Sequence, residues 1–322
     1  MLKIFKTIIA IAFTSAVVAS DVNVNKQFVD FIEKYGKVYK NQAEFEHRFN
    51  IFKSSLEILS ARRQVGNKTH GITKFSDMTP EEFKATLTLK VGNQWCRPTA
   101  LKFLQDVQNA DSLDWRAKGK VSPIKDQGQC GSCWAFSTTG FMESQLLMTN
   151  DTAETFSEQQ LVDCDTTYGD AGCNGGLQQN AFNYITDNGI MGDAGYRYTA
   201  YKGYCEYKKA DAKHSVQNIK CHENASVADI KTYLNQVGPM AIALDATDFQ
   251  YYDSGILECY NSNLDHAVLL VGYGTENGED YWIVKNSWGQ SWGEAGFVRV
   301  SQKASSNCAI GVYLVSAEVT KN

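Results

Sequence analysis

A chain of 322 residues is long enough for about two domains. Its composition, with 43% hydrophobic residues, 21% charged residues and only four prolines, is that of a globular protein and excludes long disordered stretches. The formal net charge of −5 argues against a nucleic-acid partner, because such partners favour a basic face.

The N-terminus predicts a secretory signal peptide over residues 1–20. Lys3 and Lys6 precede an apolar run over residues 8–18, and Val18-Ala19-Ser20 offers small residues for cleavage. The run is too short to serve comfortably as a membrane anchor, so no membrane span is expected after signal removal. Nine cysteines agree with an oxidising compartment, and we expect the protein in the lysosome or secreted. Sequons that could carry glycans in a secreted chain begin at Asn67, Asn150 and Asn224.

Residues 21–108 are predicted to form a mainly helical leader. Phe28, Phe31, Ile32 and Tyr35 recur with helical spacing, and Gly36 is a plausible stop. A second helix is expected from about residue 41 to residue 63. An extended segment is expected next, over residues 71–77, and then a weakly patterned linker over residues 91–109.

Residues 109–322 are predicted to form a second domain in which helices precede strands. A long helix should start near Ser132, a short one should start at a Ser157/Gln160 capping box, and a third should end at Asn188-Gly189. Strands are then expected over residues 240–244, 266–273, 281–286 and 297–300, with Asn277-Gly278 in a turn. This order predicts an α+β protein with two lobes, and a cleft between lobes is a natural active-site location.

The two parts of the chain carry opposite charge. Residues 1–108 hold 16 Lys/Arg and 10 Asp/Glu, a net of +6, whereas residues 109–322 hold 15 and 26, a net of −11. We therefore expect electrostatic attraction between leader and domain. Acid would neutralise carboxylates and weaken that attraction.

Cys133 is the candidate nucleophile. A cysteine at the start of a helix faces the positive end of the helix dipole, which favours the reactive thiolate. Its base is expected to be His266, which begins an apolar strand. Asn286, at the end of the next strand, could orient the imidazole, and Trp288 could shield that hydrogen bond from water.

These residues lie in motifs that resemble the papain and cathepsin family of cysteine proteases. Cys130-Gly131-Ser132-Cys133-Trp134 is followed by His266 and Asn286 at 133 and 153 residues after Cys133. Gly172-Cys173-Asn174-Gly175-Gly176 and Asn286-Ser287-Trp288-Gly289 are similar to that family's other signatures. The resemblance implies a papain-like fold, with a helical lobe, a β-barrel-like lobe and a cleft between them.

The resemblance also implies a role for each residue. Cys133 would attack the peptide carbonyl as a thiolate paired with the His266 imidazolium, and Asn286 would orient the ring. Gln127 and the backbone N–H of Cys133 would stabilise the oxyanion. The extended substrate would pair with Gly175 and Gly176, with Asp265 also at the substrate. Trp292 resembles the aromatic on the leaving-group side.

Other classes of protein explain the motifs less well. A thioredoxin-type Cys-x-x-Cys would leave Gln127, His266 and Asn286 without a role. A zinc site lacks a second closely spaced ligand pair, so neither a metal nor a cofactor is expected. The remaining alternative is a secreted protein on the same scaffold that binds peptides or inhibits without cleaving.

The cysteine pairing follows from the resemblance and not from spacing. It implies the bridges Cys130–Cys173, Cys164–Cys205 and Cys259–Cys308, with Cys133 free. Cys96 and Cys221 fall outside this pattern. A bridge between them, tying leader to enzyme, is a hypothesis, and two separate free thiols are the alternative.

The leader resembles the inhibitory propeptides of cathepsin L-like enzymes. Glu44, Arg48 and Phe52 share one helix face, but the later positions depart, with Ser55, Leu59 and Arg63 where Asn, Ile and Asn are usual. The segment with Gly71, Thr73, Phe75 and Asp77 resembles the one that follows. Autoinhibition until acid releases the leader is expected, and a folding spacer is the alternative.

The resemblance places a specificity pocket for the second residue before the scissile bond. Its expected lining is Leu177, Gln178, Ala243, Leu264 and Ala267, with Tyr313 as its floor. A bulky floor favours Leu or Val over basic side chains. Endopeptidase action on proteins and peptides, a monomeric state and cystatin-like inhibitors are expected.

Overall fold

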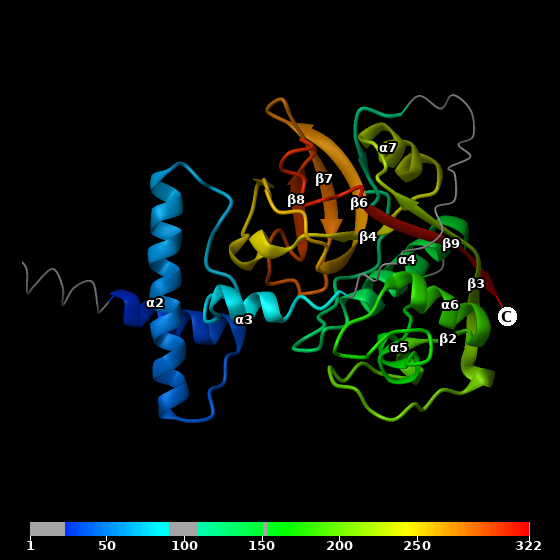
Figure 1. The fold of residues 1–322 in the computed structure, drawn as a ribbon, viewed down its shortest axis with the longest axis horizontal. Coiled ribbons are helices and arrows are strands. Elements are labelled where there is room, and N and C mark those ends of the chain that lie inside the picture. The colour runs from blue at the N-terminus through cyan, green and yellow to red at the C-terminus, as the bar shows by residue number, and fades with distance from the viewer. Residues whose placement is uncertain (1–22, 90–108, 151–152, 322) are drawn as a thin grey trace, which may run out of the picture.

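The computed structural model describes residues 23–89, 109–150 and 153–321. The expected signal peptide and most of the expected linker lie outside these residues. The leader helices stand at one end of the molecule, and the rest of the chain forms a helix-rich lobe beside a lobe built on a sheet (Figure 1).

The described part of the leader contains a helix over residues 23–35, α2 (Gln42–Gln64) and the short α3 (Pro80–Ala85). Asn41 caps α2 by accepting the backbone N–H of Glu44 at 3.0 Å, so the helix begins and ends within one residue of its predicted bounds. Aromatic rings of the first helix and α2 pack together around Phe28 and Phe52. The leader therefore has a small core of its own.

The helical lobe is assembled around α4 (Cys133–Asn150). This helix packs against α5 (Glu158–Cys164) and α6 (Gln178–Asn188). Ser157 caps α5 as predicted by accepting the Gln160 N–H, but the reciprocal half of the capping box is not formed. The Gln160 side chain instead bonds to the backbone of Met191 and Gly189, because this helix start is buried in the lobe.

The second lobe is built on a nine-stranded sheet in the order β2-β3-β9-β4-β6-β7-β8-β5, with β1 paired to β6. The strands are β1 (Leu113–Asp114), β2 (Ile190–Met191), β3 (Ala212–Glu223), β4 (Met240–Leu244), β5 (Ile256–Leu257), β6 (His266–Glu276), β7 (Glu279–Lys285), β8 (Phe297–Ser301) and β9 (Tyr313–Lys321). One further helix, α7 (Val227–Gln236), and three short 3-10 turns, Asp193–Gly195, Lys209–Asp211 and Thr247–Tyr251, complete the described elements.

The sheet brings two predicted strand ends together at the cleft. β6 pairs with β7 through a tight turn in which Asn277 and Gly278 both have positive φ, as the Asn-Gly signal predicts. β6 begins at His266, and Asn286 directly follows β7. The hairpin therefore places both side chains at the same edge of the sheet.

Three disulfides join the pairs that the resemblance implies: Cys130–Cys173, Cys164–Cys205 and Cys259–Cys308. Cys133 is free and buried. Cys221 is disulfide-bonded, whereas Cys96 lies outside the described residues. Over the ranges that the structure describes, no helix combines the length and apolar character needed to cross a membrane.

Candidate active site

Cys133 is the first residue of α4, with only 1% of its surface exposed. The turn before it is held by the Cys130–Cys173 bridge and by the Gly131 N–H, which donates to the Cys173 carbonyl at 3.0 Å. The thiol therefore sits at the N-terminal end of a long helix on a turn that is fixed covalently.

His266 and Asn286 form a hydrogen-bonded pair at the facing sheet edge. His266 Nε2 lies 2.8 Å from Asn286 Oδ1, and the same oxygen accepts the Ser287 N–H at 2.8 Å. Because Oδ1 only accepts, Nε2 must carry the proton, which leaves Nδ1 of a neutral ring as an acceptor. Trp288 stacks on the imidazole at a centroid distance of 4.7 Å and shields the pair from water.

Gln127 is 4% exposed and held by its neighbours on several sides. Its backbone N–H donates to Ser287 O at 2.9 Å, and its side-chain Oε1 accepts from Ser287 Oγ at 2.6 Å. Its Nε2 donates to the Cys130 carbonyl at 2.9 Å. The amide nitrogen is thereby turned toward the start of α4. Sequence analysis assigned Ser287 no role, although it lies within the Asn-Ser-Trp-Gly motif.

A direct hydrogen bond ties the helix of Cys133 to the strand of His266. Ser137, one turn into α4, donates from Oγ to the Val268 carbonyl of β6 at 2.7 Å. This bond is buried, and it lies one turn from Cys133 and two residues from His266. It limits how far the thiol and the imidazole can move apart.

Burial shifts the pKa values of both members of the pair. Burial raises the pKa of Cys133 to about 12, although backbone N–H groups of Ala267 and Trp134 oppose the shift. Burial also lowers the pKa of His266 to about 4, against the favourable contact with Asn286. Burial therefore opposes the charged form of each group in this leader-bound structure, whereas the helix N-terminus favours the thiolate.

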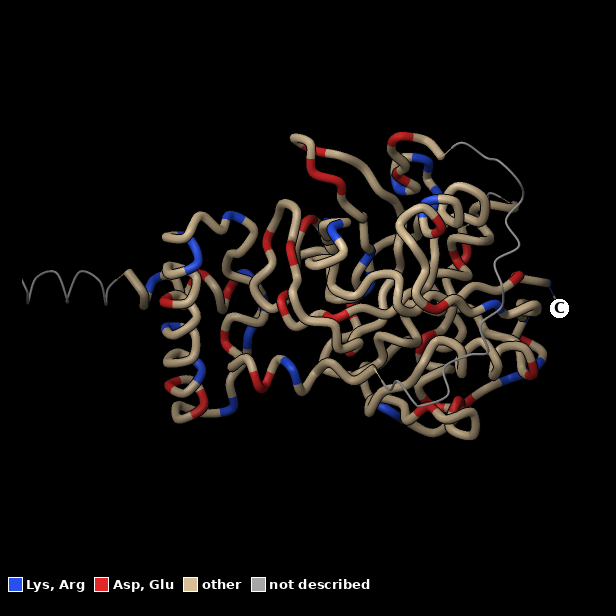
Figure 2. The backbone as a smooth tube through the Cα atoms, turned by 45° about the horizontal axis from the view of Figure 1, so that its top comes forward, with Lys and Arg blue, Asp and Glu red and all other residues tan. Residues whose placement is uncertain are grey.

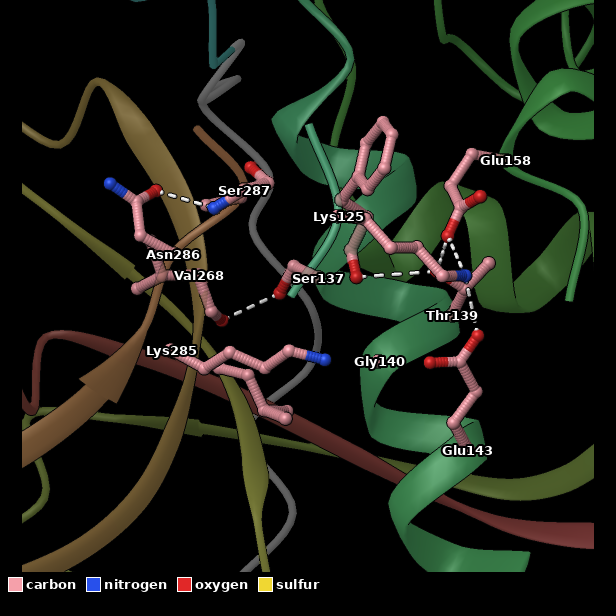
Figure 3. Close-up of a pocket in the computed structure, with 13 residues that line it drawn as sticks. Lys125, Ser137, Thr139, Gly140, Glu143, Glu158, Val268, Lys285, Asn286 and Ser287 are labelled. Atoms are coloured by element: carbon pink, nitrogen blue, oxygen red, sulfur yellow. Dashed lines mark hydrogen bonds and ion pairs between the residues drawn. The ribbon is translucent and has the colours of Figure 1, made fainter. Parts of the chain in front are cut away.

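A buried cluster of charges lies between the lobes beside this site (Figure 3). Lys125 Nζ contacts Glu143 and Glu158, each at 2.6 Å, and these carboxylates raise the Lys125 pKa although burial alone would lower it. Lys285, at the end of β7, donates to Ser122 Oγ at 2.8 Å, and Ser122 in turn bonds to Glu143. Burial lowers the pKa of Lys285 to about 8. The chain of contacts runs from the sheet lobe to α4.

The leader crosses the cleft at the expected substrate edge. Thr88 Oγ1 donates to the Gly131 carbonyl at 3.0 Å, and the Leu89 N–H donates to the Asp265 carbonyl at 3.1 Å. Gly175 has a φ of 99°, and a Cβ there would lie 1.8 Å from the Thr88 carbonyl oxygen. Only glycine permits both the backbone conformation and this close approach.

A second leader contact covers the aromatic shield of His266. Phe75 and Phe83 lie edge-on to Trp288 at centroid distances of 4.9 and 5.7 Å. The Gln250 side chain donates to the carbonyls of Phe75 and Met78. Trp288 is consequently only 4% exposed.

The leader also pairs with the loop around Tyr251. His70 forms an antiparallel bridge with Tyr252, and Thr73 Oγ1 donates to the Gln250 carbonyl at 2.5 Å. One position that departs from the usual propeptide pattern contacts this loop directly, because Ser55 hydrogen-bonds to the Tyr251 hydroxyl at 3.1 Å. Leu59, another such position, is buried.

Charge contributes less to this docking than the net charges predict. Lys74 pairs with Asp126 across the interface at 2.7 Å, whereas the Lys37–Asp77 and Arg48–Glu82 pairs lie within the leader. Figure 2 shows residues of both signs interspersed along the leader helices. Apolar and backbone contacts form most of the described interface.

The residues expected to line the specificity pocket differ in their surroundings. Leu177, Ala243, Leu264, Ala267 and Tyr313 belong to one buried apolar cluster, and the leader's own Leu89 joins it. Gln178 lies inside the protein instead, where its amide donates to the Ile242 carbonyl at 2.8 Å and to Ser137 Oγ at 3.2 Å. Gly176 is buried beside Gly175, and its α-carbon faces the Asp170 carboxyl group.

The structure places the two tryptophans that follow Asn286 differently. Trp292 is fully buried beneath Trp288, and its indole N–H donates to the Phe249 carbonyl at 3.3 Å. Trp288 is the ring that lies between His266 and the leader. Both tryptophans follow Asn286 within six residues, so packing and not sequence distinguishes them.

No cluster of three or more metal-ligating side chains occurs among the residues described. The arrangement of a cysteine at a helix start, an oriented histidine and amide donors is suited to nucleophilic attack on a carbonyl carbon.

Comparison with known proteins gives a consistent result. Residues 109–317 match the model described as "Papain family cysteine protease", and residues 28–83 match "Cathepsin propeptide inhibitor domain (I29)". The chain is 40% identical to digestive cysteine proteinase 2 of Homarus americanus, over 87% of this chain and 90% of that protein. It is 38% identical to a cathepsin L-like proteinase of Phaedon cochleariae, over 95% and 97% of the two chains. The structure of digestive procathepsin L 3 from Tenebrio molitor larval midgut superposes with a TM-score of 0.83 at 37% identity, covering 91% of this chain and 98% of that one.

Proposed function

The chain belongs to the papain family of cysteine proteases, and on that premise we propose that Cys133 and His266 carry out peptide-bond hydrolysis. The enzyme is made as a zymogen with an inhibitory leader, as its cathepsin L-like relatives and the leader match indicate. These relatives give no support to a scaffold that binds peptides without cleaving them.

In the proposed mechanism, His266 Nδ1 takes the Cys133 proton and the thiolate attacks the substrate carbonyl carbon. Gln127 Nε2 and the backbone N–H of Cys133 stabilise the oxyanion. The imidazolium then protonates the leaving amine, and water hydrolyses the acyl-enzyme. The observation that carries this assignment is the 2.8 Å bond between His266 Nε2 and Asn286 Oδ1, because it frees Nδ1 for the thiol.

Activation is proposed to act on the charge states of this pair. With the leader in place, burial raises the pKa of Cys133 and lowers the pKa of His266, and both shifts disfavour the charged pair. Removal of Thr88 and Leu89 from the cleft would readmit water, so the helix N-terminus and the neighbouring imidazolium could stabilise the thiolate. The leader would then block the substrate edge and suppress the reactive form at the same time.

The test is to acidify the purified zymogen and titrate the product with a thiol-directed epoxide. We expect one equivalent of inhibitor on Cys133 and loss of all peptidase activity in parallel. A Cys133→Ser variant, processed in trans by wild-type enzyme, should neither bind the epoxide nor cleave peptides at a comparable rate. Peptide cleavage by a Cys133→Ala variant would refute the mechanism.

We propose that the specificity pocket prefers Leu or Val at the second position before the scissile bond. Leu89 of the leader already lies in the apolar cluster that includes Leu177, Ala267 and Tyr313. Trp288, rather than Trp292, would contact the leaving-group side. A fluorogenic library scanned at the second position should give Leu and Val above Arg, and a preference for Arg would refute the pocket.

We further propose that Cys96 and Cys221 form a bridge between leader and enzyme. Cys221 is disulfide-bonded, and of the other described cysteines Cys133 is free while the remaining six are paired with one another. The cleaved leader would then remain attached until it is reduced. Non-reducing peptide mapping of the zymogen should yield the linked peptide, and separate free thiols would refute the bridge.

The signal peptide, the domain boundaries near residues 20 and 108, and delivery to the lysosome or the exterior are also proposed. Support comes from the paired cysteines and from the digestive and cathepsin L-like relatives. Asn224 is exposed, so glycosidase treatment of the expressed protein should change the mass of its peptide. A monomeric state and sensitivity to cystatin-like inhibitors can be checked by light scattering and inhibitor titration.

A further inference from the structure

The oxyanion donor proposed above depends on a backbone that is fixed from two sides. On one side Ser287 binds both the N–H and the side chain of Gln127. On the other side the Gln127 carbonyl accepts a hydrogen bond from the Tyr198 hydroxyl at 2.8 Å. Tyr198 lies 71 residues later in the chain and contributes nothing to the motifs recognised in the sequence.

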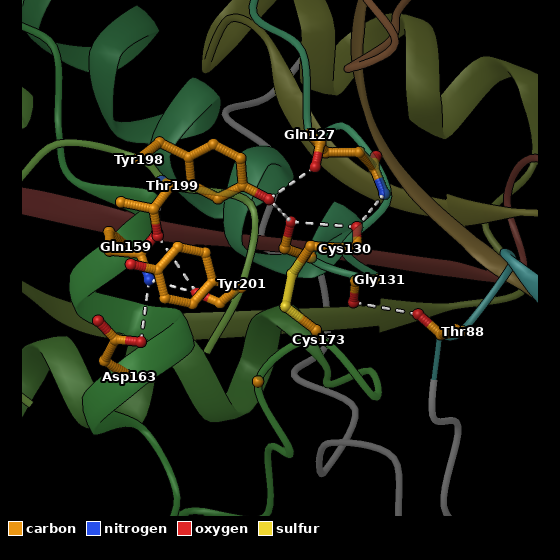
Figure 4. The surroundings of a disulfide bond; sticks show 12 residues. Thr88, Gln127, Cys130, Gly131, Gln159, Asp163, Cys173, Tyr198, Thr199 and Tyr201 are labelled. Carbon is orange, nitrogen blue, oxygen red and sulfur yellow. Dashed lines mark hydrogen bonds between the residues drawn. A yellow bond between two sulfur atoms is a disulfide. The ribbon is translucent and has the colours of Figure 1, made fainter. Parts of the chain in front are cut away.

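The Tyr198 hydroxyl also reaches the residue before the nucleophile. Its oxygen lies 2.6 Å from Ser132 Oγ (Figure 4). Because the phenol has one proton and gives it to Gln127, Ser132 must be the donor in this second bond. Phe136, on the first turn of α4, packs edge-on against the Tyr198 ring at 4.8 Å and limits its rotation. One hydroxyl thus joins Gln127 to the segment that carries the Cys133 N–H.

The loop that carries Tyr198 is itself held in place. Gln159 of α5 accepts the Thr199 N–H at 2.8 Å and donates to the Tyr201 carbonyl at 2.8 Å (Figure 4). The Cys164–Cys205 disulfide closes the same loop onto the end of α5. The phenol is therefore presented by a rigid support, which is a requirement for a group that positions others.

We propose that Tyr198 is a positioning residue for the oxyanion site, acting through Gln127 and Ser132. Its hydroxyl fixes the positions of the Gln127 side-chain amide and the Cys133 N–H relative to each other. Both donors then point at the oxyanion that develops on the substrate carbonyl. The inference rests on the proposed role of Gln127. It adds a third segment of the chain, far from both Cys133 and His266 in sequence, to the geometry of that site.

The test is a Tyr198→Phe variant assayed on a peptide amide for which acylation limits turnover. Removing a whole oxyanion donor costs roughly 100- to 1000-fold, so a misaligned donor should lower kcat by about 3- to 10-fold with KM within about twofold. Affinity for a peptide aldehyde, whose thiol adduct is tetrahedral, should fall by a similar factor. Alkylation of Cys133 by iodoacetamide, which forms no oxyanion, should be unchanged.

Tyr196→Phe is the matched control. Tyr196 lies on the same loop, and its hydroxyl is equally engaged, with Asp163 Oδ2 at 2.8 Å and the Glu206 N–H at 2.9 Å, but it does not bond to Gln127. This variant should retain wild-type kcat. Equal losses in both variants would mean that the loop acts only through general stability, and would overturn the inference.

A double variant separates this inference from the proposed function. In a Gln127→Ala background, Tyr198→Phe should cost less than twofold further, because the donor that it positions is gone. A full additional loss there would overturn the inference. If Gln127→Ala alone left kcat unchanged, the proposed role of Gln127 would fail. If Gln127→Ala lowered kcat but Tyr198→Phe did not, only the role of Tyr198 would fail.

Discussion

Replacing Phe83 by alanine should open the zymogen without altering the catalytic residues. Phe83 is 1% exposed and lies between Phe75 of the leader and Trp288 of the enzyme. Trp288 in turn stacks on His266. The substitution removes a buried ring from the contact between leader and enzyme.

The size of the effect follows from the burial. Truncating a buried phenylalanine to alanine costs about 3–5 kcal/mol. Each 1.4 kcal/mol changes an equilibrium by about tenfold, so even the lower figure makes leader opening about 100 times more frequent. Phe83→Leu retains most of the apolar volume and should increase opening by about tenfold or less.

The assay is the rate of iodoacetamide labelling of Cys133 in the intact zymogen at neutral pH, followed by the mass of the unprocessed chain. Cys133 is the free cysteine of the described residues and is 1% exposed, so labelling requires the leader to move away. Val38→Ala, at a leader position that is 90% exposed, is the control and should label like wild type. A Phe83→Ala zymogen that stays folded and labels within threefold of wild type would refute the reasoning.

Three further outcomes are expected. Asn286→Ala should lower kcat/KM about 10- to 100-fold, because His266 loses its partner at Nε2, and a loss below twofold on peptide substrates would contradict the assignment. Gly175→Ala should raise KM about tenfold or more and should speed the labelling of Cys133 in the zymogen. The reason is that Gly175 has a φ of 99° and an added Cβ would clash with the chain that crosses the cleft. An unchanged KM would mean that the substrate does not bind along this edge. Burial, together with the Arg62 charge, lowers the pKa of His70 from 6.5 to about 4 in the docked leader, so the free leader binds more protons between those values and docking weakens as pH falls through that window. His70→Gln should therefore shift the pH of half-maximal activation downward by about half a unit in a stopped-time activation series, and an unshifted profile would exclude His70 as a contributor.

The catalytic set was accessible from sequence because its members are rare residue types at the ends of well-patterned elements. Cys133 begins a helix, His266 begins a strand and Asn286 directly follows the next one, and each of these elements lies within a few residues of its predicted bounds. The Asn277-Gly278 dipeptide was sufficient to predict the tight turn that joins the two strands of the hairpin. The sequence was therefore sufficient to predict a site residue wherever its motif lies at the end of a helix or strand.

The remaining features depend on contacts that the sequence does not localise. Trp288 and Trp292 are the same residue type four positions apart, and only packing reveals that the first covers His266 while the second is buried. Gln178 faces the interior because Ser137 and Ile242 lie beneath it. The raised pKa of Cys133 arises from its burial in the folded chain, which the nucleophile motif alone does not reveal.

The charged cluster between the lobes has a consequence for how the enzyme melts. Lys285 of the sheet lobe is linked through Ser122 to Glu143 of α4, and Glu143 shares Lys125 with Glu158. Parting the lobes would break the hydrogen-bonded link from Lys285 through Ser122 to Glu143, and leaving such a buried group unsatisfied costs about 1–3 kcal/mol, against the roughly 5–15 kcal/mol that typically stabilises a domain. Heat should therefore unfold the two lobes in one cooperative transition. Below the temperature of that transition, the distance between the lobes across the cleft should vary no more than distances within either lobe.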